Sequence, residues 1–341
     1  MKHASIVLFL VFLFSSCRTS NNPANSTPPP QSDRGVFIIN EGAFPNAGTM
    51  SFYNITKDIA FETIISAAEG WLLPNDAKVF GNKVYVVVNG SDRVEVLDAE
   101  TFQKLGTIVI PTGSGPGYIS IVDNTKAIVA NYNGTVSLLN LTTRTVTQTT
   151  PPVVEFPGSI VVVGNKVFDS DFGPFQNNKD IVIVMDAVTL SVTDTIRVSV
   201  AAGSMVAGSN DRLYVVSTGI FPANGKVYAV NTLTNAVVDS VEVGQGPTDI
   251  TFADQSLYVL LFDRVVKLST FPLAVADIAF VSLSSGLYFY STVADPVTGD
   301  LYVSKVVSGD GSGVVEVYTP LKSPKRQPFA VGSFPGAWAF K

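Results

Sequence analysis

Short runs of apolar residues alternate with turn-forming residues along most of the chain, and the stretch Asn82–Tyr118 shows this unit most clearly. Its first run, Val84–Val88, is β-branched and aromatic, which is the composition that strands prefer. A turn of Asn, Gly, Ser and Asp follows, and apolar and polar residues then alternate from Val94 to Asp98 with the period of a half-buried strand. A third β-branched run and a cluster of Gly and Pro complete the unit. The pattern therefore predicts consecutive short strands joined by turns.

The same unit recurs along the chain at a nearly constant interval. Three later units repeat the word Leu-Tyr-Val at the centre of their second strand. An interval of roughly 40 to 48 residues with four strands per unit is the spacing of a β-propeller blade. The sequence therefore predicts an all-β fold, a seven-bladed β-propeller with four-stranded blades. The predicted centres of the second strands are Phe37, Tyr85, Ile128, Phe168, Tyr214, Tyr258 and Tyr302.

The two ends of the repeat predict how the ring closes. The first unit has only three strands, Val36–Asn40, Thr49–Tyr53 and Ala60–Ile65, and lacks the inner strand that elsewhere follows a Gly/Pro turn. The chain ends with one additional strand, Phe334–Phe340. We expect this C-terminal strand to join the first blade as its inner strand, because closure of the ring hides strand edges that would otherwise pair with other chains.

The amino terminus has the composition of an export signal. Lys2 precedes an apolar run, Ile6–Phe14, that has the length of a signal-peptide core and is too short to span a bilayer. The four residues that end at Cys17 resemble a bacterial lipobox, so we expect residues 1–17 to be a lipoprotein signal peptide and Cys17 to be lipidated. An ordinary signal peptide with an incidental cysteine is the alternative. Residues 18–34 are rich in Ser, Asn and Pro, which predicts a disordered tether before a propeller at residues 35–341.

The residue that follows the lipobox cysteine bears on the location of the protein. An acidic residue directly after the lipidated cysteine resembles an inner-membrane retention signal, but this position is occupied by Arg18. No acidic cluster follows Arg18. We therefore expect a protein that is lipid-anchored in the bacterial outer membrane. The periplasmic face and the cell surface both remain open as its side of that membrane.

Composition excludes several classes of function. Charged residues make up 15% of the chain and the net charge is −6. Nucleic-acid affinity depends on clustered Lys and Arg, and the one basic cluster, Lys322–Arg326, is typical of a solvated loop, so we expect no nucleic-acid partner. The single cysteine, Cys17, and the single histidine, His3, lie at the amino terminus. The body of the protein therefore has no disulfide, no cysteine nucleophile, no histidine base and no metal site built on either residue type.

The repeat and the export signal together resemble a known group of proteins. The words from Lys83 to Gly117 resemble the YVTN-type repeat of the YncE-like propellers, and the opening Gly35–Gly42 after a lipobox and tether resembles Bacteroidetes surface lipoproteins of that group. The resemblance covers residues 35–341. This group includes the cobalamin-capturing BtuG type, which sits over an outer-membrane transporter. The resemblance therefore implies a small-molecule ligand, with cobalamin as a candidate, and an outer-membrane transporter as a partner, although propellers host many unrelated activities.

One face of such a ring is the predicted binding face. Strand alternation places the loops between second and third strands there, and these loops are long at residues 41–48, 172–179, 219–225 and 307–313. Long loops on a rigid scaffold commonly carry binding residues, and aromatic groups supply large contact areas. The candidate ligand-binding residues, which are aromatic or carry carboxylate or amide groups, are Glu41, Phe44, Trp71, Asn131, Tyr132, Asp171, Phe172, Phe175, Phe221, Asp263, Tyr288 and Phe334.

The polar members of this set leave the chemistry open. Carboxylate and amide oxygens around a channel mouth could bind Ca²⁺ or hydrogen-bond a ligand, whereas Asp and Asn at strand ends commonly cap turns. No other cofactor is indicated. The expected function is a non-catalytic binding lipoprotein. The alternatives are a protein-interaction or envelope-scaffold propeller and a Ca²⁺-dependent lactonase-like hydrolase, which without histidine would rely on carboxylate or metal-water chemistry.

Overall fold

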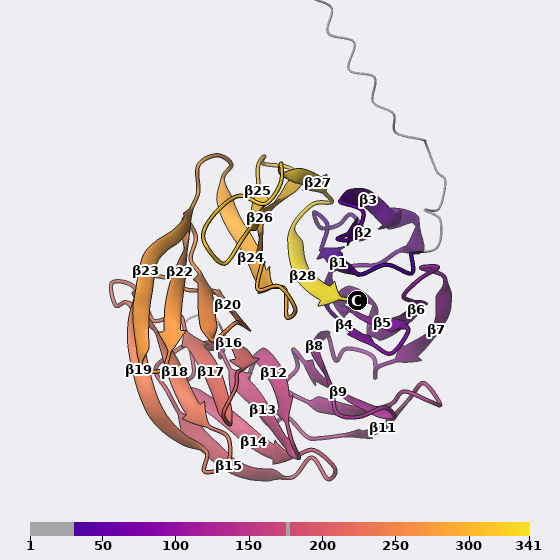
Figure 1. The fold of residues 1–341 in the computed structure, drawn as a ribbon. Coiled ribbons are helices and arrows are strands. Elements are labelled where there is room, and N and C mark those ends of the chain that lie inside the picture. Colours follow the sequence, from indigo (N-terminus) through magenta and orange to yellow (C-terminus); the bar gives the residue numbers. More distant parts are fainter. Residues whose placement is uncertain (1–30, 175–177) are drawn as a thin grey trace, which may run out of the picture.

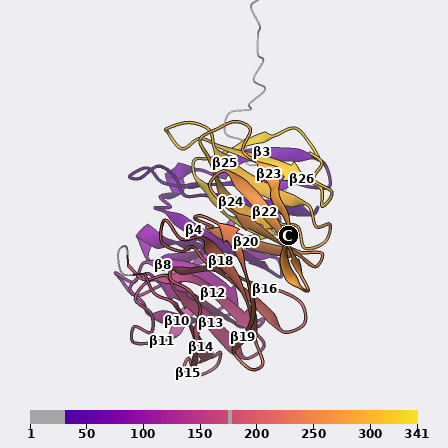
Figure 2. The same cartoon turned by 90° about the vertical axis from the view of Figure 1, so that its left-hand side faces the viewer.

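Each predicted unit folds into a four-stranded antiparallel sheet, and seven such sheets form a ring in the computed structural model, which describes residues 31–174 and 178–341. The chain passes once around the ring, so the blades in Figure 1 follow one another from indigo to yellow. Figure 2 shows the same ring from its left-hand side. The prediction of a seven-bladed propeller with four-stranded blades is confirmed.

The blades are numbered in chain order, and within each blade the strands run from the inner to the outer position. Two short 3-10 helices, η1 (Ala67–Glu69) and η2 (Asn89–Ser91), lie in the connecting segments. The strands are β28 (Pro335–Phe340), β1 (Gly35–Asn40), β2 (Thr49–Asn54) and β3 (Ile59–Ile65) in blade 1; β4 (Pro74–Phe80), β5 (Lys83–Val88), β6 (Arg93–Asp98) and β7 (Lys104–Val109) in blade 2; β8 (Pro116–Ile121), β9 (Lys126–Asn131), β10 (Val136–Asn140) and β11 (Thr145–Thr149) in blade 3; β12 (Pro157–Val163), β13 (Lys166–Asp171), β14 (Ile181–Asp186) and β15 (Val192–Arg197) in blade 4; β16 (Ala202–Ala207), β17 (Arg212–Ser217), β18 (Gly225–Asn231) and β19 (Ala236–Gly244) in blade 5; β20 (Asp249–Ala253), β21 (Ser256–Leu260), β22 (Arg264–Thr270) and β23 (Leu273–Ser282) in blade 6; and β24 (Tyr288–Ala294), β25 (Leu301–Val306), β26 (Gly313–Tyr318) and β27 (Phe329–Val331) in blade 7.

The ring is closed by the C-terminal strand, as the incomplete first unit predicts. Strand β28 pairs antiparallel with β1, with Ile38 opposite Trp338 and Val36 opposite Phe340. Figure 1 shows β28, in yellow, beside the indigo strands of blade 1. The first blade is therefore built from both ends of the described chain.

The core lies between neighbouring blades. The second strand of each blade is buried because its two sheet neighbours and the two adjacent blades cover it on all sides. Tyr85, Tyr258 and Tyr302, at the centres of three second strands, are almost completely buried. Blade 1 packs on blade 2 through a cluster that includes Phe37 and Val86. This burial explains why the strand centres carry the repeat in the sequence.

The two faces of the ring differ in the length of their connections. The segments 41–48, 172–180, 218–224 and 307–312 join second to third strands on one face, which we call the loop face. The connections between first and second strands, such as the tight turn at Gly81–Asn82, and those between third and fourth strands lie on the opposite face, which we call the turn face. The first residue of each inner strand also lies at the loop face, because Pro74 pairs with Val88 at the end of β5.

Residues 31–34, the last four of the predicted tether, lie against the turn face. Gln31 is buried, its side-chain oxygen accepts a hydrogen bond from Asn54 at 2.8 Å, and its carbonyl accepts one from Lys341. Arg34 forms an ion pair with Asp295 in the turn between β24 and β25. The predicted signal peptide and residues 18–30 lie outside the described residues. Within the described ranges, no helix has the length and apolar character needed to cross a membrane.

Candidate functional site

The start of the inner strands is irregular in a way that shapes the centre of the ring. In six of the seven sheets the register with the second strand slips at this point; for example, Pro74 pairs with Val88 but Asp76 pairs with Val87. Such a bulge bends the strand and turns the extra residue in a new direction. The residues at this position around the ring are Asn75, Gly117, Gly158, Gly203, Thr248, Tyr290 and Gly336.

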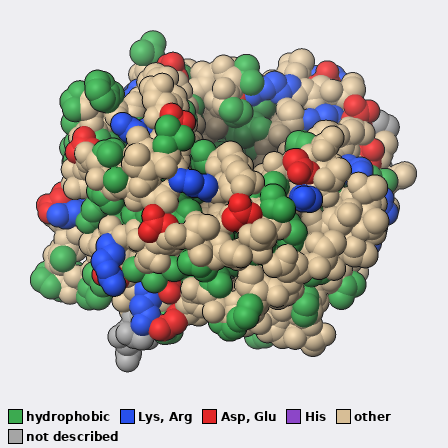
Figure 3. Space-filling view, turned by 90° about the horizontal axis from the view of Figure 1, so that it is seen from below, with side chains coloured by type: hydrophobic (Ala, Val, Ile, Leu, Met, Phe, Trp, Pro, Cys, Tyr) green, Lys and Arg blue, Asp and Glu red, His purple; other side chains and the backbone are tan. Residues whose placement is uncertain are grey.

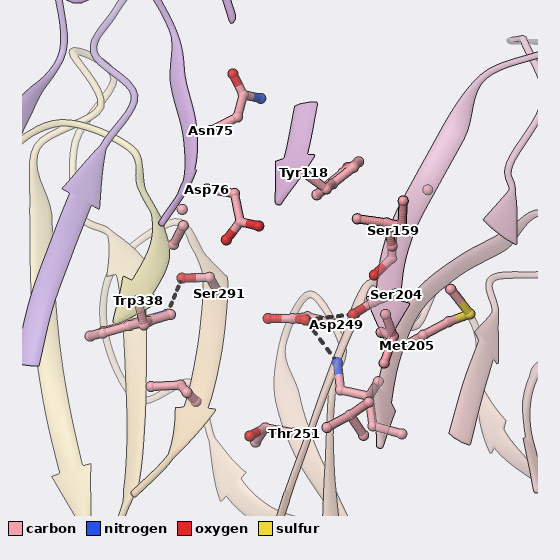
Figure 4. Close-up of a pocket in the computed structure, with 18 of the residues that line it drawn as sticks. Asn75, Asp76, Tyr118, Ser159, Ser204, Met205, Asp249, Thr251, Ser291 and Trp338 are labelled. Atoms are coloured by element: carbon pink, nitrogen blue, oxygen red, sulfur yellow. Dashed lines mark hydrogen bonds between the residues drawn. The ribbon is translucent and has the colours of Figure 1, made fainter. Parts of the chain in front are cut away.

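The inner strands surround a central cavity of about 670 Å³ to which all seven blades contribute. This volume falls in the range of small-molecule sites. Many hydroxyl groups line it, together with the carboxylates of Glu41, Asp76 and Asp249, and Lys78 is the single basic side chain among the described lining residues. Figure 4 shows the carboxylates of Asp76 and Asp249 pointing into this space from β4 and β20.

Two of the carboxylates fasten neighbouring inner strands together. The Oδ2 atom of Asp76 accepts a hydrogen bond from the backbone N–H of Ile119 in the next blade at 2.9 Å. Asp249 accepts one from the Ser204 hydroxyl of blade 5 at 2.9 Å and one from the Thr292 N–H of blade 7 at 3.1 Å. Burial raises the pKa of Asp249, and these hydrogen bonds oppose that rise. Both groups therefore satisfy N–H groups that an inner strand, as the edge of its sheet, leaves unpaired.

Glu41 and Tyr132 overhang the end of the cavity that lies at the loop face, which we call the opening. Each comes one residue after the end of a second strand, and each lies over a bulge glycine of its own blade. A Cβ atom on Gly336 would overlap the Glu41 carboxylate, and one on Gly117 would lie 3.1 Å from the Tyr132 ring. The hydroxyl of Tyr290 donates to Glu41 at 2.7 Å. Burial raises the pKa of the Glu41 carboxyl, and the bond from Tyr290 opposes this.

Aromatic rings flank this opening in two groups. In the first, Tyr132 stacks on Phe156 with ring centroids 4.6 Å apart, and Tyr118 meets Tyr132 edge-on at 6.0 Å. The second runs from Phe262 through Tyr288 and Tyr290 to Phe334, with successive centroids between 5.1 and 6.3 Å apart. The two groups come from blades 3 and 4 and from blades 6, 7 and 1, so they border the opening on different sides.

The structure places the candidate residues of the sequence in several different settings. Glu41 and Tyr132 line the cavity, and Tyr288 and Phe334 contact Tyr290 beside it. Phe44, Phe221 and Asp263 are exposed on the loop face, and Phe172 is half-buried near Gly203. Trp71, Asn131 and Asp171 are buried in structural roles, whereas Phe175 and Cys17 lie outside the described residues.

The contacts of these three buried residues explain their positions. Trp71 packs in the core between blades 1 and 2. The Asn131 amide donates to the hydroxyls of Thr135 and Ser137, and so ties β9 to β10. Asp171 accepts the backbone N–H groups of residues 155, 156 and 173, which holds the loops around it. These are the turn-capping roles that Asp and Asn take at strand ends.

Five lining residues that carry a carboxylate, amide or phenol group lie outside the predicted set. They come from the inner strands, whereas the prediction concentrated on loops. The signal that could have found two of them is the word Pro-x-Asp, which begins two inner strands. The bulge that turns the others inward has no counterpart in the alternation of apolar and polar residues. The missed residues are Asn75, Asp76, Tyr118, Asp249 and Tyr290.

Charges and potential metal ligands are sparse on the described molecule. No group of three or more His, Cys, Asp or Glu side chains is arranged to hold a metal ion within residues 31–174 and 178–341. On the side shown in Figure 3, basic and acidic side chains lie singly or in small groups of both signs among apolar and uncharged ones. A phosphate backbone is bound by clustered Lys and Arg, and this side of the molecule carries no such cluster.

The ring and its polar central cavity define the class of the molecule as a seven-bladed β-propeller. The sequence family described as "Domain of unknown function (DUF5074)" matches residues 34–318, so the chain belongs to this family. No curated protein matches the sequence.

Solved structures that are similar to this ring include the following two. Hydrazine synthase of Kuenenia stuttgartiensis is 13% identical with a TM-score of 0.65, over 77% of this chain and 88% of that chain. A quinonprotein alcohol dehydrogenase-like protein from Bacteroides thetaiotaomicron is 14% identical with a TM-score of 0.66, over 89% of this chain and 77% of that chain. At such low identity these similarities show the fold alone.

Proposed function

We propose that this protein is a non-catalytic lipoprotein of the outer membrane that binds a small molecule at the opening of its central cavity. The observation that carries the proposal is the opening itself, where Glu41 and Tyr132 overhang a cavity of about 670 Å³. Two aromatic groups border the opening, and rings of this kind supply large contact area at low entropic cost. Concave sites with a few directed polar groups are the usual form of small-molecule sites.

The polarity of the lining indicates which ligands suit it. Three carboxylates and many hydroxyl oxygens present hydrogen-bond acceptors, and Lys78, the one lysine among the described lining residues, is paired with Asp76 at 2.7 Å. Such a lining disfavours anions and favours ligands with N–H or O–H donors. A cobalamin-type ligand carries amide groups around a broad planar ring, so it could cover the opening and donate into it. This ligand is the one implied by the resemblance to YncE-like lipoproteins.

Two observations support binding without catalysis and with a protein partner. Asp76 and Asp249 already accept several hydrogen bonds that join blades, which suits a structural role better than proton transfer. On the loop face, Phe44 is 74% exposed and Phe221 is 82% exposed. Exposed aromatic side chains on one face are typical of protein-protein contacts. We therefore propose an outer-membrane transporter as the partner that takes over the ligand.

Calorimetric titration of the purified protein with cyanocobalamin tests the proposed ligand. We expect saturable binding at micromolar or lower concentration, and about a tenfold loss of affinity in Tyr132→Ala, because that change removes one of the flanking rings. The matched control is Phe271→Ala, since Phe271 is 93% exposed in a tight connection on the turn face. Absence of heat at micromolar concentrations excludes this ligand, and equal effects of the two variants move the site away from the opening.

Fractionation of cells tests the proposed anchor. We expect Cys17→Ser to move the protein from the detergent-extracted membrane fraction to the soluble fraction, because lipidation at this thiol is the proposed attachment. Thr19→Ser, two residues further on, serves as the matched control and stays with the membranes. Retention of the Cys17→Ser protein in the membrane fraction contradicts anchoring through this residue.

A further inference from the structure

Four neighbouring blades place polar side chains on one arc of the opening. In ring order these are Tyr290 of blade 7, Glu41 of blade 1, Asn75 of blade 2 and Tyr132 of blade 3. Tyr290 donates to Glu41 at 2.7 Å, and the Asn75 amide donates to the Tyr132 hydroxyl at 3.2 Å. We call these four residues the acceptor arc. It lies at the bulge positions and strand ends that turn toward the cavity.

The acceptor arc has more hydrogen-bond acceptors than donors. The Asn75 side-chain oxygen is buried and has no hydrogen-bond partner among the described residues. Tyr290 is the one described group that donates to the Glu41 carboxylate, and it reaches only Oε2. An ionised carboxylate has about four acceptor sites, and buried acceptors are normally paired. A ligand that supplies several N–H donors would complete both groups.

The charges around the acceptor arc have one sign. Glu41 and Asp76 both lie near enough to Tyr118 and Tyr132 to raise the pKa of each phenol, although burial is the larger cause in both. Asp249 adds a third carboxylate to the cavity, and Lys78 is paired with Asp76. Within the described lining, no basic side chain faces Glu41 as a partner. The opening is therefore a site of negative potential.

Aromatic faces border the same arc on both sides. Tyr132 belongs to the stack with Phe156, and Tyr290 contacts Tyr288 and Phe334. Aromatic faces attract cations, and the attraction is stronger where water is displaced. A carboxylate between aromatic walls, with few competing cations, is a favourable setting for an organic cation.

From this geometry we propose that the acceptor arc binds the primary ammonium group of an organic amine, with Glu41 as its counter-ion and the oxygen of Asn75 as a second acceptor. This inference rests on the proposed capture of a small molecule at the opening and names the chemical class of the group that enters it. The flanking rings would contact the carbon skeleton that carries the amine. The glycine at position 336 keeps the space that the Glu41 carboxylate occupies.

Titration calorimetry with three probes of matched shape tests this assignment. Phenethylamine carries the cation, phenethyl alcohol is its neutral counterpart, and hydrocinnamate is the corresponding anion. We expect the amine to bind at least about tenfold more tightly than either of the others, because only the amine supplies both charge and three donors. Equal affinities for the three probes overturn the inference.

Variants separate the acceptor arc from other sources of amine affinity. Glu41→Gln removes the charge at nearly constant shape, and Gly336→Ala leaves the charge but displaces the carboxylate, so each should weaken phenethylamine binding by about tenfold or more. The matched control is Glu62→Gln, a carboxylate exposed on β3 of the same blade, which should bind as the wild type does. Thermal melts establish that each variant is folded. Unchanged amine binding in folded Glu41→Gln protein overturns the inference.

The same protein preparation distinguishes this inference from the function on which it rests. Cyanocobalamin binding together with equal affinities for the three probes overturns the amine assignment and leaves capture at the opening standing. Amine selectivity that depends on Glu41, without cyanocobalamin binding, supports the amine assignment and replaces the corrinoid as the ligand class. Absence of binding by every probe overturns both.

Discussion

A chain that ends at Val331 is expected to lose most of its cooperative unfolding transition. This truncation removes β28, in which Trp338 is 9% exposed and its indole N–H donates to Ser291 of blade 7 at 2.9 Å. The strand also covers one edge of β1 and closes the cores that blade 1 shares with blades 2 and 7. Loss of a buried Trp side chain alone costs about 3–5 kcal/mol, and a whole domain is typically stable by about 5–15 kcal/mol.

Urea unfolding followed by tryptophan fluorescence and circular dichroism measures this loss. Trp338→Ala provides a graded comparison, with an expected destabilisation of about 3–5 kcal/mol in a protein that still folds. Addition of a synthetic peptide with the sequence of residues 332–341 should restore part of the transition to the truncated chain, because the vacant edge of β1 can accept it. A truncated chain that unfolds at the same urea concentration as the full chain would mean that β28 does not close the ring.

Asp169→Asn is expected to stabilise the protein increasingly as the pH rises above 5. Asp169 lies on β13 between Ile160 and Ile183 of its neighbouring strands, and it is fully buried. Neither of its carboxylate oxygens has a hydrogen-bond partner among the described residues. Burial, and to a smaller extent the charge of Asp171, raise the pKa of this carboxyl well above its usual value of 3.8.

The direction of this effect follows from proton uptake on folding. Between pH 3.8 and the raised pKa of the folded state, folding must protonate Asp169, so wild-type stability falls as the pH rises across this window. The amide of Asn has no such requirement. The difference in unfolding free energy between Asp169→Asn and wild type should therefore grow by up to about 1.4 kcal/mol per pH unit, until the folded-state pKa is passed.

Urea unfolding at pH 5, 6 and 7 measures this difference. Asp263→Asn is the matched control, because its carboxylate is 61% exposed beside Arg264 and its effect should stay constant with pH. A constant difference for Asp169→Asn as well would show that the carboxyl is ionised in the folded protein.

The sequence carries nearly all of the information about the architecture. The second strands are buried from all sides, so their apolar centres repeat wherever the blade repeats, and Tyr85, Tyr258 and Tyr302 mark three of them. The first unit has three strands and the chain ends with one additional strand. Together they imply that the ring is closed by this last strand, because an open ring would leave two strand edges exposed. The β1–β28 pairing confirms this prediction.

The candidate site could be predicted only in part, for two physical reasons. Glu41 and Tyr132 stand directly after strand ends, so strand alternation places them at the loop face and the structure brings both to the cavity. The direction in which the side chains of Asn75 and Tyr290 point depends on a one-residue bulge. A bulge reverses the alternation of side chains along a strand, so the pattern of apolar and polar residues no longer predicts on which face of the sheet a side chain lies. Trp71 illustrates the second reason, since an aromatic residue in a connecting segment covers the core as readily as it binds a ligand.

The attachment of residues 31–34 to the turn face also bears on how the ring is oriented relative to the membrane. If the lipid at Cys17 holds the protein at the outer membrane as proposed, the turn face is the side nearest the bilayer, because residues 18–30 span at most about 45 Å when fully extended. The opening on the loop face then points toward the aqueous phase, with the thickness of the ring between it and the lipid. A ligand would arrive from solution without crossing the headgroup layer. A receiving protein in the same membrane would have to extend past the rim of the ring, or the ring would have to tip over on its anchor before each transfer.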